Sequence, residues 1–94
     1  MTVQLKFLGA LRHASGKDQV SLSCQDGTSV FELIKNASRR KPALRRNLLD
    51  EQMDPPKPNA LVLVNGREIS ILDGLETKVK DGDEIVFVPV VHGG

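Results

Sequence analysis

The most constraining feature of the sequence is the strand-like run EIVFVPVV, because it is apolar on both of the faces that a strand presents. Ile85 and Phe87 alternate with Val86 and Val88, so side chains of both orientations are hydrophobic. A strand of this kind lies in the middle of its sheet, or its second face meets a partner. Pro89 cannot donate a hydrogen bond to a neighbouring strand, so we expect pairing to weaken there.

Further runs supply the neighbours that such a strand needs. The segments TVQLKFLG (residues 2–9) and QVSLSC (residues 19–24) alternate apolar and polar residues, which is typical of half-buried strands. The polar segment between them predicts a hairpin with a longish loop. The segment ALVLVNGREI (residues 60–69) predicts a second, tight hairpin, because Asn65-Gly66 suits a primed turn.

One stretch has helical rather than strand periodicity. Ser29, with Glu32 three residues later, forms a capping-box signature, and the apolar residues that follow recur at helical spacing. We expect a helix from Ser29 to Lys41, since Pro42 disfavours helical geometry in the residue before it. Pro42 is also suited to begin a second, short helix. The segment DPPKP (residues 54–58) is expected to be a loop.

These elements predict an α+β fold in which one main helix covers one face of a sheet. The expected core packs the helix against the sheet, with Phe31 or Val30 joining Leu33, Ile34 and Ala37 opposite Leu5, Phe7, Leu22 and Ile85. The other sheet face is expected to be apolar as well, through Leu8, Val62 or its neighbours, Val86 and Val88. In the alternative interpretation, Val86 and Val88 lie under a loop and form a second small core.

Size and composition limit the function. A length of 94 residues predicts a single domain spanning residues 1–94. The net charge of +1 makes direct nucleic-acid binding unexpected, and no apolar run approaches a membrane span. The N-terminus does not resemble a signal peptide, so we expect a cytoplasmic protein. A lone Cys24 makes no internal disulfide and provides no metal-ligand spacing, so no metal site is expected.

The segment LVNGREISILDGLETKVKDGDEIVFVPVVHGG (residues 63–94) resembles the C-terminal third of the MoaD and ThiS sulfur carriers. The resemblance is most specific at three pairs of residues, Asn65-Gly66, Gly82-Asp83 and Gly93-Gly94. The HGG ending is similar to that of the ubiquitin-related modifier family. The resemblance implies the β-grasp fold of ubiquitin, with a mixed sheet of about five strands and one main helix packed on one face.

The resemblance also implies a chemistry for Gly94. An E1-like partner enzyme would adenylate the Gly94 carboxylate with ATP and Mg, and a sulfur donor would convert it to a thiocarboxylate. The sulfur would serve molybdenum cofactor biosynthesis, through a molybdopterin synthase large subunit-like acceptor, or else tRNA thiolation or thiamin synthesis. Alternatively, target-protein lysines would take the acyl group as an isopeptide. In every case the chain is a carrier rather than an enzyme, with no catalytic residue and no intrinsic cofactor of its own.

Physical reasoning agrees with such a tail. A free α-carboxyl has a pKa near about 3.5, so at neutral pH it is an anion and a poor electrophile until it is activated. We expect residues 92–94 to form a flexible C-terminal tail that reaches roughly 10 Å beyond the last strand. Gly93 lacks a Cβ and permits close approach of another backbone, and His92 is expected to position the tail.

Two classes of function therefore remain open. In the first, Gly94 is the activated terminus, Gly93 and His92 are recognised by the partner, and Val86, Val88 and Val90 form the partner-binding face. In the second, the domain is a β-grasp interaction module that binds through its open apolar face and does not use its tail.

The remaining candidate residues have less specific signals. His13 is expected to be solvated in a polar loop, and Cys24 to be a small core residue. The basic stretch Lys35 to Arg46 contains six cations and no acid, which suits an acidic partner, RNA or simply a solvated helix face. It has no interleaved aromatics for base stacking. Any lysine that serves conjugation would come from an ordinary surface set that includes Lys6, Lys17, Lys57 and Lys78.

Overall fold

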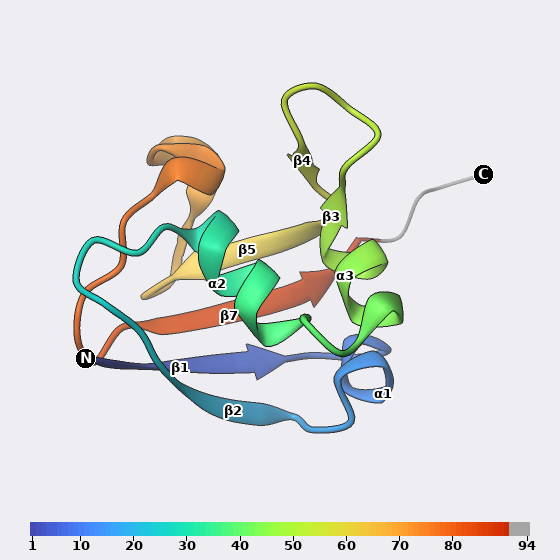
Figure 1. Ribbon diagram of the computed structural model, residues 1–94, viewed down its shortest axis with the longest axis horizontal. Coiled ribbons are helices and arrows are strands. Elements are labelled where there is room, and N and C mark those ends of the chain that lie inside the picture. Colours follow the sequence, from blue (N-terminus) through green and yellow to red (C-terminus); the bar gives the residue numbers. More distant parts are fainter. Residues whose placement is uncertain (91–94) are drawn as a thin grey trace.

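The fold is built around β7 (Glu84–Pro89), which is the central strand of a five-stranded mixed sheet in a computed structural model that describes residues 1–90 (Figure 1). The strand order is β2-β1-β7-β5-β6. β7 pairs in parallel with β1 and antiparallel with β5, as its apolar sequence predicts. The other strands of the sheet are β1 (Thr2–Phe7), β2 (Gln19–Ser23), β5 (Ala60–Val64) and β6 (Arg67–Glu68).

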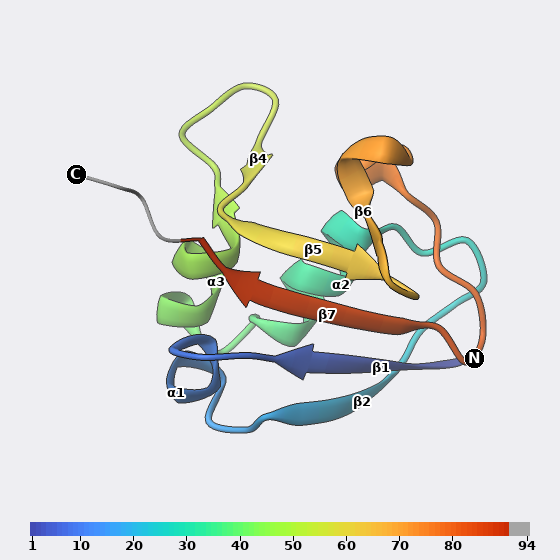
Figure 2. The same cartoon turned by 180° about the vertical axis from the view of Figure 1, so that it is seen from behind.

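The helices lie on one side of this sheet. α2 (Val30–Ala37) and α3 (Pro42–Leu48) lie in front of the strands in Figure 1, and the view from behind shows the other face of the sheet without a helix over it (Figure 2). Two short 3-10 helices, η1 (Ile69–Ile71) and η2 (Gly74–Glu76), form the connection to β7. The layered arrangement confirms the predicted class, with one covered and one uncovered sheet face.

The connection between β1 and β2 differs from the prediction, because it contains a helix, α1 (Leu11–Ser15), rather than only a polar loop. Leu11 is buried and anchors this turn to the core, and Gly16 ends it in a left-handed conformation with φ of 79°. A single buried leucine in a helix of five residues produces no periodic pattern, which is why the sequence did not predict α1.

α2 begins where it was predicted to begin and ends earlier. The Ser29 side chain accepts a hydrogen bond from the backbone N–H of Glu32 at 3.1 Å, which is the expected N-cap contact. The helix stops at Ala37 rather than at Lys41, because Ser38 takes the C-cap position and its hydroxyl donates to the Ile34 carbonyl at 2.6 Å. Pro42 then begins α3 as predicted.

The core lies between the helices and the inward-facing side of the sheet. Val30, Leu33 and Ile34 of α2 are fully buried, as expected, whereas Phe31 and Ala37 are only partly buried. On the sheet side, the buried residues include Val3, Leu5, Phe7, Val62, Ile85 and Phe87, while Leu22 on the edge strand β2 is half-buried. The rings of Phe7 and Phe87 stack with centroids 5.3 Å apart, which joins β1 to β7 within the core.

The loop regions agree in part with the prediction from the sequence. The segment DPPKP was predicted to be entirely loop, but its last two residues form β4 (Lys57–Pro58), which pairs with β3 (Leu49–Asp50) in a separate two-stranded sheet. Pro58 is tolerated because this small sheet has no further strand that would need its missing N–H. In the connection before β7, Val79 is buried and Leu72 and Leu75 pack against the core, so three apolar side chains anchor this segment.

The turn of the β5–β6 hairpin also holds the start of β7 through the side chains of Asn65 and Asp83, and we name these contacts the clamp. Asn65 and Gly66 have φ of 51° and 84°, as a primed turn requires. The side-chain amide of Asn65 donates to the Asp83 carboxylate at 2.8 Å, and its carbonyl oxygen accepts from the backbone N–H of Glu84 at 2.9 Å. The second carboxylate oxygen of Asp83 accepts from the Lys80 N–H at 2.8 Å. These bonds hold the start of β7 against the hairpin.

We predict that Leu33→Ala lowers the free energy of unfolding by about 2–5 kcal/mol, because it opens a cavity beneath a fully buried helix residue. Urea unfolding followed by circular dichroism measures the loss. Arg40→Ala, on an exposed position of the next turn, serves as the control and should change stability by no more than about 0.5 kcal/mol. A loss below about 1 kcal/mol for Leu33→Ala would contradict the core packing described above.

We further predict a graded effect at Asn65. Asn65→Gly keeps the positive φ accessible and removes both side-chain bonds, so it should cost about 1–2 kcal/mol. Asn65→Ala adds the strain of a left-handed residue and should cost about 1 kcal/mol more. Asn47→Ala, which removes an exposed intrahelical bond to the Ala43 carbonyl, is the matched control and should change stability little. If Asn65→Gly is as stable as the unmodified chain, the clamp contributes nothing.

Candidate functional site

The uncovered face of the sheet carries an apolar stripe on its two central strands. Val86 and Val88 alternate with the buried Ile85 and Phe87 and therefore point to this face. The register places Leu61 beside Val88 and Leu63 beside Val86. We name these four residues the open stripe: Leu61, Leu63, Val86 and Val88. The sequence predicted Leu61 and Leu63 on this face only as neighbours of Val62. Val62 itself is buried in the core.

The open stripe is accessible. Leu61 is 37% exposed, and Leu63, Val86 and Val88 are half-buried. No helix or loop among residues 1–90 lies over this face in the view from behind (Figure 2). The alternative in which Val86 and Val88 form a second core under a loop of the described chain is therefore wrong. Exposed apolar surface of this kind commonly marks a contact with another protein.

Two further exposed apolar residues lie towards the end of β7. Leu8 and Val90 directly follow the last residues of β1 and β7, and they are 45% and 47% exposed. Val90 was one of the three residues predicted to face a partner, together with Val86 and Val88. Strand alternation places Val86 and Val88 on the uncovered face beside Leu61 and Leu63. Val90 follows the end of β7 and lines a hollow together with residues of α1 and α3.

The other half of the same face is polar. The Lys6 ammonium and the Glu84 carboxylate form an ion pair across β1 and β7 at 2.9 Å. The side-chain oxygen of Gln4 accepts hydrogen bonds from Gln19 and from Ser21, at 3.2 Å and 3.0 Å. The uncovered face thus has an apolar half over β5 and β7 and a polar half over β1 and β2. A partner that buries only the apolar half avoids the cost of desolvating the polar groups.

The point at which the chain leaves the sheet is tightly packed. The last ladder pair of β7 is Ala60 with Pro89, so the pairing stops where the proline predicted it would. Gly9, with φ of 55°, lies against Pro89, and a Cβ on Gly9 would stand only 3.0 Å from the Pro89 Cγ. The N–H of Leu8 donates to the Phe87 carbonyl at 3.0 Å. These contacts hold the end of β7 against the turn that follows β1.

The predicted residues of the tail, His92, Gly93 and Gly94, lie outside the described residues. Val90, the last described residue, lines a surface hollow of about 200 Å³. The other residues that line it come from α1, α3, β7 and the segments next to α1 and β5, namely Ala10, Leu11, Arg46, Asn47, Asn59 and Pro89. The apolar stripe and this hollow therefore flank the position from which the chain continues.

The other candidate residues are not brought into this site. His13 is exposed, as expected, although it lies on α1 rather than in a loop. Cys24 is only half-buried against the core, so the prediction of a core position is correct in part. Of the surface lysines, Lys17, Lys57 and Lys78 are exposed.

Within residues 1–90, no three His, Cys, Asp or Glu side chains lie close enough together to hold a metal ion. None of the helices in that range is long and apolar enough to cross a membrane.

Comparison with known proteins identifies the family. The model of the ThiS family matches residues 5–94. Small archaeal modifier protein 3 of Haloferax volcanii is 30% identical over the full length of both chains, and ubiquitin-related modifier 1 of Schizosaccharomyces pombe is 29% identical over the full length of both. The solution structure of small archaeal modifier protein 1 from Methanosarcina acetivorans is 33% identical, covers 99% of this chain and 96% of its own, and superimposes with a TM-score of 0.80.

These findings confirm the predicted resemblance and the β-grasp fold. They also include both of the families that the sequence resembles, the sulfur carriers and the ubiquitin-related modifiers. The chain belongs to the ThiS family and is a small ubiquitin-like protein of the sulfur-carrier and protein-modifier class.

Proposed function

We propose that this chain is a sulfur carrier whose Gly94 carboxylate is adenylated by an E1-like enzyme and then converted to a thiocarboxylate. The observation that carries the proposal is the open stripe, which lies on the strand that leads along the sequence to Gly94. A partner that binds this stripe is thereby placed beside the departing chain. Membership of the ThiS family supports the class of reaction.

The chemistry requires little of the carrier itself. A carboxylate oxygen of Gly94 attacks the α-phosphorus of ATP, which the partner holds with Mg, and pyrophosphate leaves. The acyl-adenylate is a far better electrophile than the carboxylate, because AMP is a good leaving group. A donor that delivers sulfide then attacks the acyl carbon, AMP departs, and a thiocarboxylate remains. The carrier supplies the electrophile, and nucleotide, metal and catalytic groups belong to the partner.

The residues near the terminus would serve access and recognition. Without side chains, Gly93 and Gly94 let the walls of a narrow cleft approach the backbone closely. His92 would position the tail in that cleft. Val86, Val88 and Val90 would form the docking face together with Leu61 and Leu63, so that binding energy far from the reacting carboxylate helps to orient it.

A second candidate function shares the first step. The relatives named small archaeal modifier protein 3 and ubiquitin-related modifier 1 align over the full length of this chain, which favours conjugation to lysines as an alternative fate of the adenylate. The two functions differ in the nucleophile, which is sulfur in one and a lysine amine in the other. As a carrier, the chain would act in the cytoplasm and hand its sulfur to a molybdopterin synthase large subunit-like acceptor or to tRNA thiolation.

We predict that Gly94 is the residue that is activated. Incubation with the host's E1-like enzyme, ATP and Mg should give ATP–pyrophosphate exchange, and addition of a sulfur donor should produce a mass increase equal to the exchange of one oxygen for sulfur. Removal of Gly93 and Gly94 should abolish both signals, because the electrophile is lost. Lys78→Gln, an exposed charge outside the open stripe, is the control and should react normally.

Exchange that persists without Gly93 and Gly94 would refute activation at this terminus. The alternative, an interaction module that does not use its tail, predicts no exchange and an unchanged affinity for its partner after the same deletion. Recovery of an isopeptide-linked product without any thiocarboxylate would favour the modifier function.

We also predict that the activating enzyme docks on the open stripe. Val88→Asp should weaken binding to the activating enzyme at least about tenfold, because the contact would desolvate a charge, while the domain stays folded. Ser21→Asp, which places the same charge on the polar half of the same face, is the matched control and should bind normally. Isothermal titration gives the affinities and circular dichroism reports folding. Normal binding by a folded Val88→Asp protein would show that the partner docks elsewhere.

A further inference from the structure

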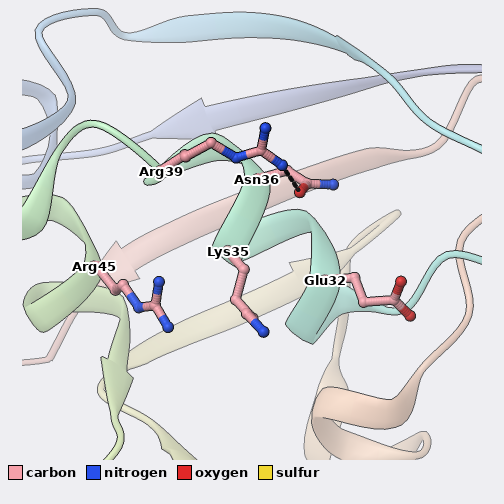
Figure 3. Close-up of a pocket in the computed structure, with 5 residues that line it drawn as sticks. All are labelled: Glu32, Lys35, Asn36, Arg39 and Arg45. Atoms are coloured by element: carbon pink, nitrogen blue, oxygen red, sulfur yellow. Dashed lines mark hydrogen bonds between the residues drawn. The ribbon is translucent and has the colours of Figure 1, made fainter.

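The side of the molecule opposite the open stripe is basic. Of the six cations in residues 35–46, Lys35 lies on the exposed side of α2, Arg39 and Arg40 lie in the turn after it, and Arg45 lies on α3 (Figure 3). We name these four residues the basic helix face: Lys35, Arg39, Arg40 and Arg45. Lys35, Arg39 and Arg45 line a surface hollow of about 290 Å³, together with Asn36 and Glu32.

Most of these cations are not neutralised within the described chain. Among residues 1–90, no carboxylate lies within ion-pair distance of Lys35, Arg39 or Arg40. Arg39 donates to the neutral side-chain oxygen of Asn36 at 3.1 Å, and the Lys35 ammonium lies 5.3 Å from the centre of the Phe31 ring. Two positive charges, those of Lys35 and Arg39, are thus held beside the hollow by contacts that leave their charge available.

The fourth cation shows what this surface binds. The Arg45 guanidinium holds the Glu51 carboxylate with two nitrogens, at 2.5 Å and 2.8 Å. This forked hydrogen bonding lowers the pKa of Glu51 and raises that of Arg45. The chain's own carboxylate therefore occupies one binding position at the rim of the hollow. Lys35 and Arg39 offer comparable donors to carboxylates that the chain itself does not supply.

The surroundings favour an acidic protein segment over a nucleic acid. A phosphate backbone carries closely and evenly spaced charges and binds best to a continuous basic track. Here Glu32 and Glu51 interrupt the track at the hollow. No Trp or Tyr occurs in the chain, and Phe31 is half-buried with Lys35 over its ring, so no exposed aromatic is available to stack on bases. The carboxylates of an acidic peptide lie on separate, flexible side chains, so such a peptide can bind between Glu32 and Glu51.

We propose that the basic helix face binds an acidic segment of a partner protein, whose carboxylates are held by Lys35 and Arg39 in the hollow between α2 and α3. This surface lies on the covered side of the sheet and the open stripe lies on the uncovered side (Figures 1 and 2). The two surfaces can therefore be occupied at the same time. The inference does not depend on activation at Gly94.

A nuclear magnetic resonance titration with an end-capped hexaglutamate peptide tests the proposal on the full chain at physiological salt. The peptide should shift backbone resonances in residues 32–46 and leave those of Val86 and Val88 unchanged. Lys35→Gln with Arg39→Gln should weaken binding about tenfold, since each exposed charge pair accounts for up to about fivefold. Lys57→Gln with Lys80→Gln removes two exposed charges elsewhere and should have a much smaller effect.

Glu51→Gln gives a second, opposite readout. It releases Arg45 from its internal carboxylate and should tighten peptide binding about three- to fivefold. Asp54→Asn makes the same change of net charge in the exposed loop between β3 and β4 and is the matched control, with little expected effect. If the binding site includes the hollow, only Glu51→Gln should tighten peptide binding. If the surface is merely positive, Glu51→Gln and Asp54→Asn should tighten it equally.

Three results would overturn the proposal. One is the absence of localised shifts in residues 32–46. Another is equal weakening by the two double variants or equal tightening by Glu51→Gln and Asp54→Asn. The third is tighter binding of a uridine decamer of RNA than of the peptide at the same residues, which would make the surface a nucleic-acid interface.

Discussion

The central position of β7 is the constraint on which the rest of the structure depends. The strand is paired on both edges, and helices cover only one of its faces. Its inward side chains, Ile85 and Phe87, are therefore core residues, whereas Val86 and Val88 must face outward. One apolar run thus stabilises the domain and provides the proposed contact surface, and the same strand ends at Pro89.

Both ends of β7 are fixed by contacts from distant segments. At its start, the Asn65 side chain binds Asp83 and Glu84, and at its end Gly9 packs against Pro89. Asn65 and Asp83, two of the residues that carried the resemblance to the sulfur carriers, thus form the clamp. In a carrier this is sensible, because the partner performs the chemistry and the fold has only to present the chain in a fixed direction.

The parts of the fold that the sequence predicted are those with a strong local pattern. The cap at Ser29, the Asn65-Gly66 turn and the doubly apolar β7 each have a signal within a few residues. α1 depends on one buried leucine, and the end of α2 depends on the Ser38 hydroxyl, so neither has such a signal. β5 is apolar at every position, so alternation alone did not reveal that Leu61 and Leu63 face outward. Its register with β7 was needed to decide this.

The two faces of the domain differ in the physics of the contact that each favours. The open stripe offers apolar area, whose contribution is nearly independent of salt, whereas the basic helix face offers charges, whose attraction is screened over about 8 Å at physiological ionic strength. Contacts on opposite sides of a sheet with no shared partner residue are expected to be nearly additive. An acidic partner held on the helix side would therefore leave the affinity of the sheet side unchanged. It would still raise the local concentration of the carrier near any enzyme attached to that partner. Carrier exchange on the open stripe and retention on the helix face are thus compatible, because neither contact has to be broken for the other to form.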